Sequence, residues 1–366
     1  MALTAGIVGL PNVGKSTLFN AITNKNILAA NYPFATIDPN VGLVTVPDER
    51  INFLKELYNP NSVVDATFEF TDIAGLVKGA SKGEGLGNKF LSHIREVDAI
   101  CEVVRCFEDE NIIHVDNNIN PISDIEVIGL ELILADLEVV ENRLNKTGKK
   151  AAMSKDKEVK FEYDLLLKIK EQLMKELPIR KMELSEEELL VVKPFHFITA
   201  KPIIYMANVA EEDLLEGGNK YTEVVQKYAS DENAKMIIVC AKMEAELSEL
   251  SLEDKLMFLE DLNITSSGLD KLIKATYDLL GLATFLTAGT DEVRAWTFKK
   301  GMKAPGCAGV IHTDFERGFI KAEVMSFDDL KKYGDEKKVK ENGRLRLEGK
   351  EYIMQDGDIC NFRFNV

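Results

Sequence analysis

The stretch that decides the fold of this chain is Gly-Leu-Pro-Asn-Val-Gly-Lys-Ser, residues 9–16. It matches the pattern G-x-x-x-x-G-K-[ST] at every fixed position. An apolar run at residues 3–8 precedes it, and apolar side chains at helical spacing follow it in residues 16–24. This order predicts a buried strand, a glycine-containing loop and a helix, which is the local structure of a P-loop.

Each fixed residue of the loop has a chemical reason. Without side chains, Gly9 and Gly14 let the backbone curl so that its N–H groups point at phosphate oxygens. Lys15 adds a cation near the β- and γ-phosphates, and the hydroxyl of Ser16 can bind Mg²⁺. The helix places its positive dipole end below the phosphates. We therefore predict a purine nucleoside triphosphate bound with Mg²⁺, and its hydrolysis.

Further strands are predicted along the first two thirds of the chain. Short apolar or alternating runs occur at residues 66–71, 99–104, 203–207 and 236–240, with helical spacing between them. Strands that alternate with helices indicate an α/β fold with a mostly parallel sheet.

A helical insertion interrupts this alternation at residues 125–195. Apolar positions recur at helical spacing in residues 130–144 and again in 159–177, with a lysine-rich, turn-like segment around Gly148 between them. Two such helices would pack as an antiparallel, coiled-coil-like hairpin. The stripes either pack only on each other or help to form a grasping surface for RNA, and both interpretations stay open.

The C-terminal part of the chain has a different pattern. An amphipathic helix is predicted at residues 268–280, and Gly281 is a natural stop for it. Short strand-like pieces follow at 293–298, 319–324 and 352–364. We predict two domains, a nucleotide-binding domain over 1–281 and a small domain over 282–366, whose length of about 85 residues is enough to fold alone.

A second motif, Asp-Ile-Ala-Gly, ends the strand predicted at residues 66–71. Asp72 can hold Mg²⁺ through water, and the backbone N–H of Gly75 can reach the γ-phosphate. Thr36 lies where a switch threonine would cap the metal, and Thr23 and Thr45 are the alternatives in the same interval. The predicted magnesium residues are Ser16, Thr36 and Asp72. Many small GTPases have Gln after this motif to orient the attacking water. Here the residue is Leu76, so intrinsic hydrolysis should be slow unless a partner or another group completes the site.

The predicted base site departs from that of GTPases. These proteins read guanine with N-K-x-D, whereas this chain has Asn208, Val209, Ala210 and Glu211 after a strand. The Lys is absent and the Asp is replaced by a longer Glu, which weakens the case for strict GTP specificity. After the last strand of this part of the chain, Cys240 and Ala241 occupy the second base-side loop, where backbone amides face the purine.

Composition excludes some classes of protein. The net charge of −16 argues against a protein that coats nucleic acid with its whole surface. From Asp291 onward there are 15 Lys and Arg against 14 Asp and Glu, a net charge of +1. The basic run at residues 331–346 is either a solvated face or a local contact to RNA phosphate. The five scattered cysteines, the lack of a signal sequence and the lack of a long apolar run predict a cytoplasmic protein without membrane segments.

Together these residues resemble the YchF family, also called the Obg-like ATPases, of the translation-factor class of P-loop GTPases. The resemblance covers essentially the whole chain and rests on residues 9–20, 31–37, 72–77, 208–211 and 355–364. It implies that ATP is preferred or accepted alongside GTP, that residues 282–366 form a β-grasp-like TGS domain, and that the ribosome or its RNA is the partner.

The resemblance also assigns roles to individual residues. It implies that Asn208 and the backbone of Val209 read the base, and that Leu76 is the hydrophobic residue found in place of Gln. The residues that it implies hold the phosphates are Asn12, Val13, Gly14, Lys15, Ser16 and Thr17.

Three functional hypotheses follow. The first is a slow, regulated ATPase whose nucleotide state gates docking on the ribosome, and we expect it to be a monomer. The second is a GTPase switch with the same architecture. The third is an RNA- or ribosome-binding scaffold in which the nucleotide is structural.

Overall fold

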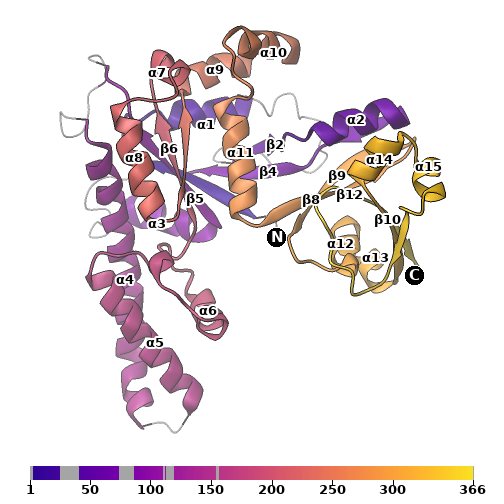
Figure 1. Ribbon diagram of the computed structural model, residues 1–366. Helices are drawn as coiled ribbons and strands as arrows, with labels where there is room; N and C mark the ends of the chain where they lie inside the picture. Colours follow the sequence, from indigo (N-terminus) through magenta and orange to yellow (C-terminus); the bar gives the residue numbers. More distant parts are fainter. Residues whose placement is uncertain are drawn as a thin grey trace. The chain divides into compact units, whose positions relative to one another are not determined.

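A computed structural model describes residues 3–24, 41–73, 86–109, 112, 119–153 and 156–365 (Figure 1). The contacts within the chain divide it into two compact units, described separately below. Unit 1 comprises residues 1–43 and 69–272, and unit 2 comprises residues 44–68 and 273–366. Residues 44–68, which the sequence analysis assigned to the first domain, therefore group with the C-terminal residues. The domain limits 1–281 and 282–366 stay predictions.

The core of unit 1 is a six-stranded sheet in the order β2-β4-β1-β5-β6-β7. Its strands are β1 (Thr4–Gly9), β2 (Val41–Thr45), β4 (Thr67–Asp72), β5 (Ala99–Arg105), β6 (Ile203–Asn208) and β7 (Lys235–Val239). The pairs β1–β4, β1–β5, β5–β6 and β6–β7 are parallel, so the prediction of a mostly parallel sheet is confirmed. Every residue of β5 and β6 is buried, which explains their mostly apolar sequences; Glu102, Arg105 and Asn208 are the buried polar exceptions.

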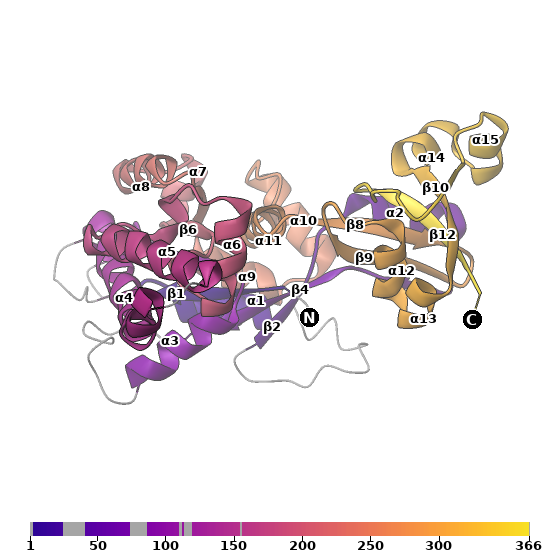
Figure 2. The same ribbon diagram turned by 90° about the horizontal axis from the view of Figure 1, so that it is seen from below.

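Helices lie on both sides of this sheet (Figure 2). Helix α1 packs beside α9, whereas α4 and α8 pack together against β5, β6 and β7. Outside the hairpin, the helices are α1 (Lys15–Asn24), α3 (Leu86–Glu96), α7 (Glu211–Leu215), α8 (Lys220–Asp231), α9 (Ala241–Glu249), α10 (Leu252–Asp261) and α11 (Gly268–Leu279). In the described part of the chain, none of the helices is both long and apolar enough to traverse a lipid bilayer.

The predicted helical hairpin is confirmed, and it extends away from the sheet (Figure 1). It consists of α4 (Pro121–Met153) and α5 (Lys157–Met174), followed by short 3-10 helices at Ile179–Lys181 and Lys193–Phe195 and by α6 (Glu186–Val192). The turn expected around Gly148 is wrong, because α4 continues through this residue. A glycine inside a helix costs only about 1 kcal/mol, and the close-packed partner helix offsets that cost.

Unit 2 is built on a second six-stranded sheet, in the order β11-β10-β12-β8-β9-β3. Its strands are β3 (Ser62–Val64), β8 (Leu282–Ala288), β9 (Glu292–Lys299), β10 (Phe319–Ser326), β11 (Arg346–Glu348) and β12 (Asp358–Phe364). Strands β8 and β9 form an antiparallel hairpin, and β3 from the N-terminal part of the chain pairs in parallel with β9. A cluster centred on Phe285 and Phe362 joins one face of the sheet to α12.

The helices of unit 2 are α2 (Glu49–Tyr58), α12 (Ala304–Ile311), α13 (Thr313–Arg317), α14 (Phe327–Tyr333) and α15 (Glu336–Glu341). Only strand-like pieces were expected in the C-terminal part, so its short helices α12 to α15 were not predicted. Side chains at the helix starts explain three of them: His312, Ser326 and Asp335 each accept a backbone N–H in the first turn. Such caps stabilise helices that are too short to show a clear periodicity.

Candidate nucleotide site

The loop between β1 and α1 has the geometry of a phosphate-binding loop. Asn12 and Gly14 have φ values of 65° and 94°, in the left-handed region that lets successive N–H groups point inward. A Cβ atom on Gly14 would lie 2.2 Å from Nδ2 of Asn208, so any other residue there would collide with the base-side loop. The helix begins at Lys15, one residue before the predicted start at Ser16.

Lys15 and Asp72 meet at this edge of the sheet. Ile7 of β1 pairs with Asp72 of β4, so the last residue of β4 lies beside the loop. The Nζ atom of Lys15 donates a hydrogen bond to Oδ1 of Asp72, and Lys15 is 8% exposed. The predicted phosphate-binding cation and the predicted magnesium carboxylate are therefore in direct contact, although they are 57 residues apart in the chain.

The residues at this edge fit a magnesium ion held together with phosphates. Ser16 and Thr17 lie in the first turn of α1 and are exposed, so their hydroxyls are accessible. The Asp72 side chain is 24% exposed. Oxygen donors of this kind suit Mg²⁺, which keeps several waters and binds few carboxylates. Among the residues that the structure describes, no group of three or more His, Cys, Asp or Glu side chains could form an all-protein metal site.

Asn208 connects the phosphate loop to the base-side loop. Its Nδ2 donates to the carbonyl of Val13 at 2.8 Å, and its Oδ1 accepts the N–H of Ala241 at 2.9 Å. The side chain is buried, with 3% exposure. Asn208 was predicted to read the base, and this positioning role was not predicted, because nothing in the motif shows that its amide reaches residue 13.

The other predicted base-site residues surround Asn208. The N–H of Val209 donates to the carbonyl of Val239 at 2.9 Å, so this N–H is already used within the protein. Glu211 is the first residue of α7, and Cys240 and Ala241 start α9. Burial raises the pKa of the Cys240 thiol, so this thiol stays protonated at neutral pH. Thr36, Gly75 and Leu76, predicted to contact metal or phosphate, lie outside the described residues.

One buried residue at the same edge was missed entirely. Arg105 ends β5, is 1% exposed and pairs in register with Asn208 of β6. Its guanidinium donates to the carbonyls of Phe107, Asp109 and Ile112 at 3.0–3.3 Å. It therefore fixes the course of the chain just after β5. The sequence signal for this role is a charged residue at the end of a strand that is apolar apart from Glu102.

Comparison with known proteins agrees with this geometry. A family model described as "50S ribosome-binding GTPase" matches residues 4–135. The model of the C-terminal YchF-GTPase domain, "Protein of unknown function (DUF933)", matches residues 282–365. A curated protein of Bacillus subtilis named "Ribosome-binding ATPase YchF" is 61% identical over the full length of both chains. This chain belongs to the YchF family.

Other members of the YchF family support the same assignment. A protein of the same name from Haemophilus ducreyi is 54% identical over the full length of both chains. The solved structure titled "Structure of the Schizosaccharomyces pombe YchF GTPase" matches with a TM-score of 0.90 and 42% identity. The match covers 99% of this chain and 97% of that one. One relative is named an ATPase and the other a GTPase, so the names alone do not decide the base.

Proposed function

We propose that this chain is a ribosome-binding ATPase that hydrolyses ATP with Mg²⁺, slowly on its own. The observation that carries the proposal is the contact of buried Lys15 with Asp72 beside the exposed hydroxyl of Ser16. This arrangement places a cation, a carboxylate and a hydroxyl around one helix N-terminus, which are the groups that bind a triphosphate with its metal. The two relatives named "Ribosome-binding ATPase YchF" support ATP as the substrate and the ribosome as the partner.

The residues of the site bind and orient the triphosphate. The Gly14 backbone and the first N–H groups of α1 donate to phosphate oxygens, while Lys15 turns from Asp72 toward the β- and γ-phosphates. Ser16 and Asp72 would hold Mg²⁺, which would supply positive charge to the phosphates when bound. Leu76 follows Gly75 in the sequence and cannot hydrogen-bond the attacking water, so we propose that the ribosome raises a slow intrinsic rate.

ATP preference is the part of this proposal that a binding experiment tests first. Labelled ATP bound with Mg²⁺ to the purified protein is competed separately with unlabelled ATP and GTP. We expect ATP to displace the label at least as well as GTP, because the Lys and Asp that recognise guanine are both replaced. Tenfold better displacement by GTP, equal to about 1.4 kcal/mol, would favour a GTPase switch.

Chelation of Mg²⁺ should abolish turnover.

A pair of variants separates positioning from base reading. Replacing Asn208 with alanine removes both hydrogen bonds between the two loops, each contributing about 1 kcal/mol. We expect ATP and GTP affinity to fall together by about tenfold or more. Replacing Glu211 with aspartate, by contrast, should change the ratio of GTP to ATP affinity in favour of GTP. Calorimetric titration of both variants with both nucleotides is the measurement. An Asn208→Ala variant that loses only one nucleotide would contradict the positioning role.

Further parts of the proposal concern the protein as a whole. We propose that it acts in the cytoplasm as a monomer, that residues 282–366 form a TGS domain, and that the α4–α5 hairpin is coiled-coil-like. We also propose that ribosomal RNA contacts exposed lysines of α14 and α15, such as Lys337 and Lys338. Co-sedimentation with ribosomes, with and without ATP, tests the partner. If the protein sediments equally in both states, nucleotide gating is wrong.

A further inference from the structure

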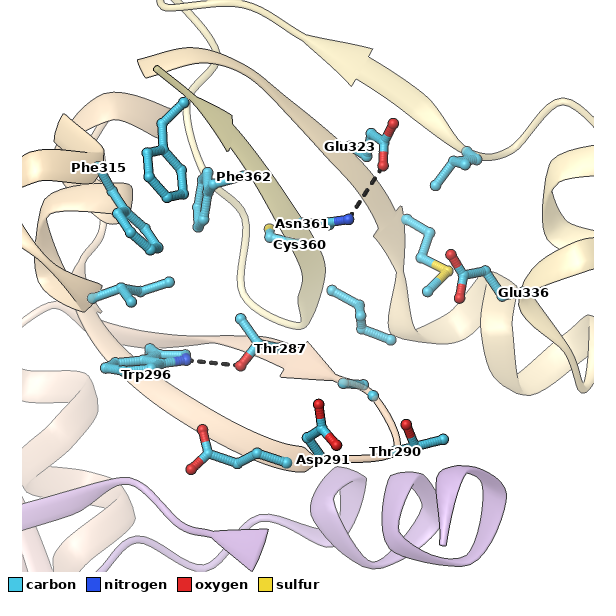
Figure 3. Close-up of a pocket in the computed structure, with 18 residues that line it drawn as sticks. Thr287, Thr290, Asp291, Trp296, Phe315, Glu323, Glu336, Cys360, Asn361 and Phe362 are labelled. Carbon is cyan, nitrogen blue, oxygen red and sulfur yellow. Dashed lines mark hydrogen bonds between the residues drawn. The ribbon is translucent and has the colours of Figure 1, made fainter. Parts of the chain in front are cut away.

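Unit 2 contains a cavity of about 620 Å³ that is separate from the nucleotide site. It lies between the β8–β9 hairpin on one side and strands β10 and β12 on the other (Figure 3). We call it the acidic hollow. In Figure 3, Phe315, Phe362 and Trp296 lie at one end of the hollow, whereas Asp291 and Glu336 lie toward the other.

The hollow exists because two neighbouring strands diverge. Strands β12 and β8 pair in parallel at a single position, Ile359 with Leu286. Beyond it, β8 continues its pairing with β9 and β12 continues its pairing with β10, so the sheet opens between them. As a result, side chains from both faces of the sheet line the space, including Ile359, Asn361 and Phe362.

The lining of the hollow carries charge of one sign. It includes four carboxylates and no Lys or Arg side chain; the carboxylates are Asp291, Glu292, Glu323 and Glu336. Arginines outside the lining compensate two of them: the Arg294–Glu292 distance is 3.8 Å and the Arg363–Glu323 distance is 3.1 Å. For Asp291 and Glu336, no ion pair exists within the described residues of unit 2, and both side chains are exposed. Two of the four carboxylates in the lining are therefore not offset by a basic side chain, although Tyr58 of α2 lies close to Glu336.

The opposite end of the hollow is aromatic. The rings of Phe315 and Phe364 stack with centroids 3.8 Å apart, and the indole of Trp296 donates to the Thr287 hydroxyl at 3.0 Å. Unit 2 already contains a cation–π contact of this kind, because the Arg294 guanidinium lies 4.1 Å from the centroid of Trp296. Aromatic rings at one end of a cavity and carboxylates at the other favour a long side chain with an apolar stem and a cationic head.

We propose that the acidic hollow binds arginine or lysine side chains of a basic protein segment. The aliphatic stem packs on the phenylalanine rings, and the cationic head reaches Asp291 and Glu336. RNA is the alternative macromolecule, but its phosphates would face carboxylates without a neighbouring lysine in the lining. This interaction surface goes beyond the proposed ATPase and does not require the nucleotide site.

The single tryptophan of the chain makes the proposal directly testable. Because Trp296 lines the hollow, its fluorescence in the full-length protein reports occupancy without a label. The probe is an eight-residue peptide of alternating arginine and glycine with blocked ends, and its counterpart replaces arginine with glutamate. We expect a saturable fluorescence change with the arginine peptide only, and a weaker affinity as salt is raised.

Matched charge variants identify the hollow as the site. Asp291→Asn with Glu336→Gln removes the two uncompensated carboxylates, and we expect peptide affinity to fall by about fivefold or more. The control, Asp328→Asn with Glu341→Gln, removes the same charge from exposed positions outside the lining and should change affinity less than about twofold. Thermal unfolding checks that all variants fold.

Three results would overturn the proposal. The first is the absence of any response to the arginine peptide, and the second is equal weakening by both double variants. The third is a single-stranded RNA of twelve nucleotides that binds, displaces the peptide and loses affinity in the hollow variant. None of these results bears on the ATPase, because ATP turnover by the same preparations is measured separately.

Discussion

Replacing Lys15 with alanine is expected to lower the kcat of ATP hydrolysis by at least about 100-fold, the usual cost of losing one preorganised group that stabilises transition-state charge. Lys15 is the side chain at the start of α1 that contacts Asp72. Its ammonium is the group able to stabilise the negative charge of the γ-phosphate during transfer. Steady-state phosphate release with saturating Mg²⁺ and ATP, with and without ribosomes, is the measurement.

A loss of activity through misfolding must be distinguished from a loss caused by the missing ammonium group. Without nucleotide, the variant should keep a Tm close to that of the native protein, because the Asp72 side chain is 24% exposed and can be hydrated. The rise in Tm on adding Mg²⁺ and ATP should shrink in proportion to the lost affinity. Lys227→Ala, at an exposed position on α8, is the control and should leave both quantities unchanged. Turnover of Lys15→Ala above a tenth of the native rate would refute the assigned role.

The second large effect concerns stability rather than catalysis. Glu232 follows α8, and its side chain is 3% exposed. Its carboxylate accepts hydrogen bonds from Arg180 at 2.9 Å and Tyr205 at 2.8 Å, and it lies 3.2 Å from the ammonium of Lys181. The contact links the chain that returns from the helical hairpin to strand β6. Glu232→Ala leaves the Arg180 guanidinium without its partner, and breaking a buried pair in this way costs about 3–5 kcal/mol.

Urea denaturation of the full-length protein measures this cost as a shift of the unfolding midpoint. Glu223→Ala is the matched control, because residue 223 lies on the same helix with an exposed side chain. It should change the free energy of unfolding by less than about 0.5 kcal/mol. A cost below about 1 kcal/mol for Glu232→Ala would mean that the arginine is hydrated without its partner.

The same contact has a predictable pH dependence. Burial by itself would raise the pKa of Glu232, but Arg180, Tyr205 and Lys181 together hold it below its usual value of 4.5. A depressed carboxyl pKa stabilises the fold at pH values above 4.5, and this stabilisation is lost as the pH falls through the lower folded-state value. The difference in unfolding free energy between the native protein and Glu232→Ala should therefore be constant near neutrality and shrink in acid.

Local patterns predicted the parts of the molecule that depend on local chemistry. Residues 9–16 predicted the strand, loop and helix at the phosphates, because glycine freedom and helix polarity act within a few residues. The motif at Asp72 identified its strand end correctly. In each case the neighbours in the sequence are the neighbours in space.

Features that depend on distant contacts were not predictable in this way. The amide of Asn208 meets a carbonyl 195 residues earlier in the chain. The sequence around Gly148 predicts a turn, yet packing of α4 on α5 keeps this residue helical. Residues 44–68 gave no sign of belonging with the C-terminal residues, because β3 has only three residues and its partner β9 is a distant part of the chain. A short pattern carries no information about a partner so far away.

The pairing of β3 with β9 also determines when unit 2 can complete its sheet during synthesis. Residues 62–64 pair with residues 292–294, and at about 5–20 residues per second a ribosome needs roughly 10–45 s to make the chain between them. During this interval β3 has no partner strand, and an unpaired strand edge is a site for wrong association. Unit 2 therefore completes its sheet only late in synthesis, and slow translation of residues 65–291 should lengthen the time in which the nascent chain depends on chaperones.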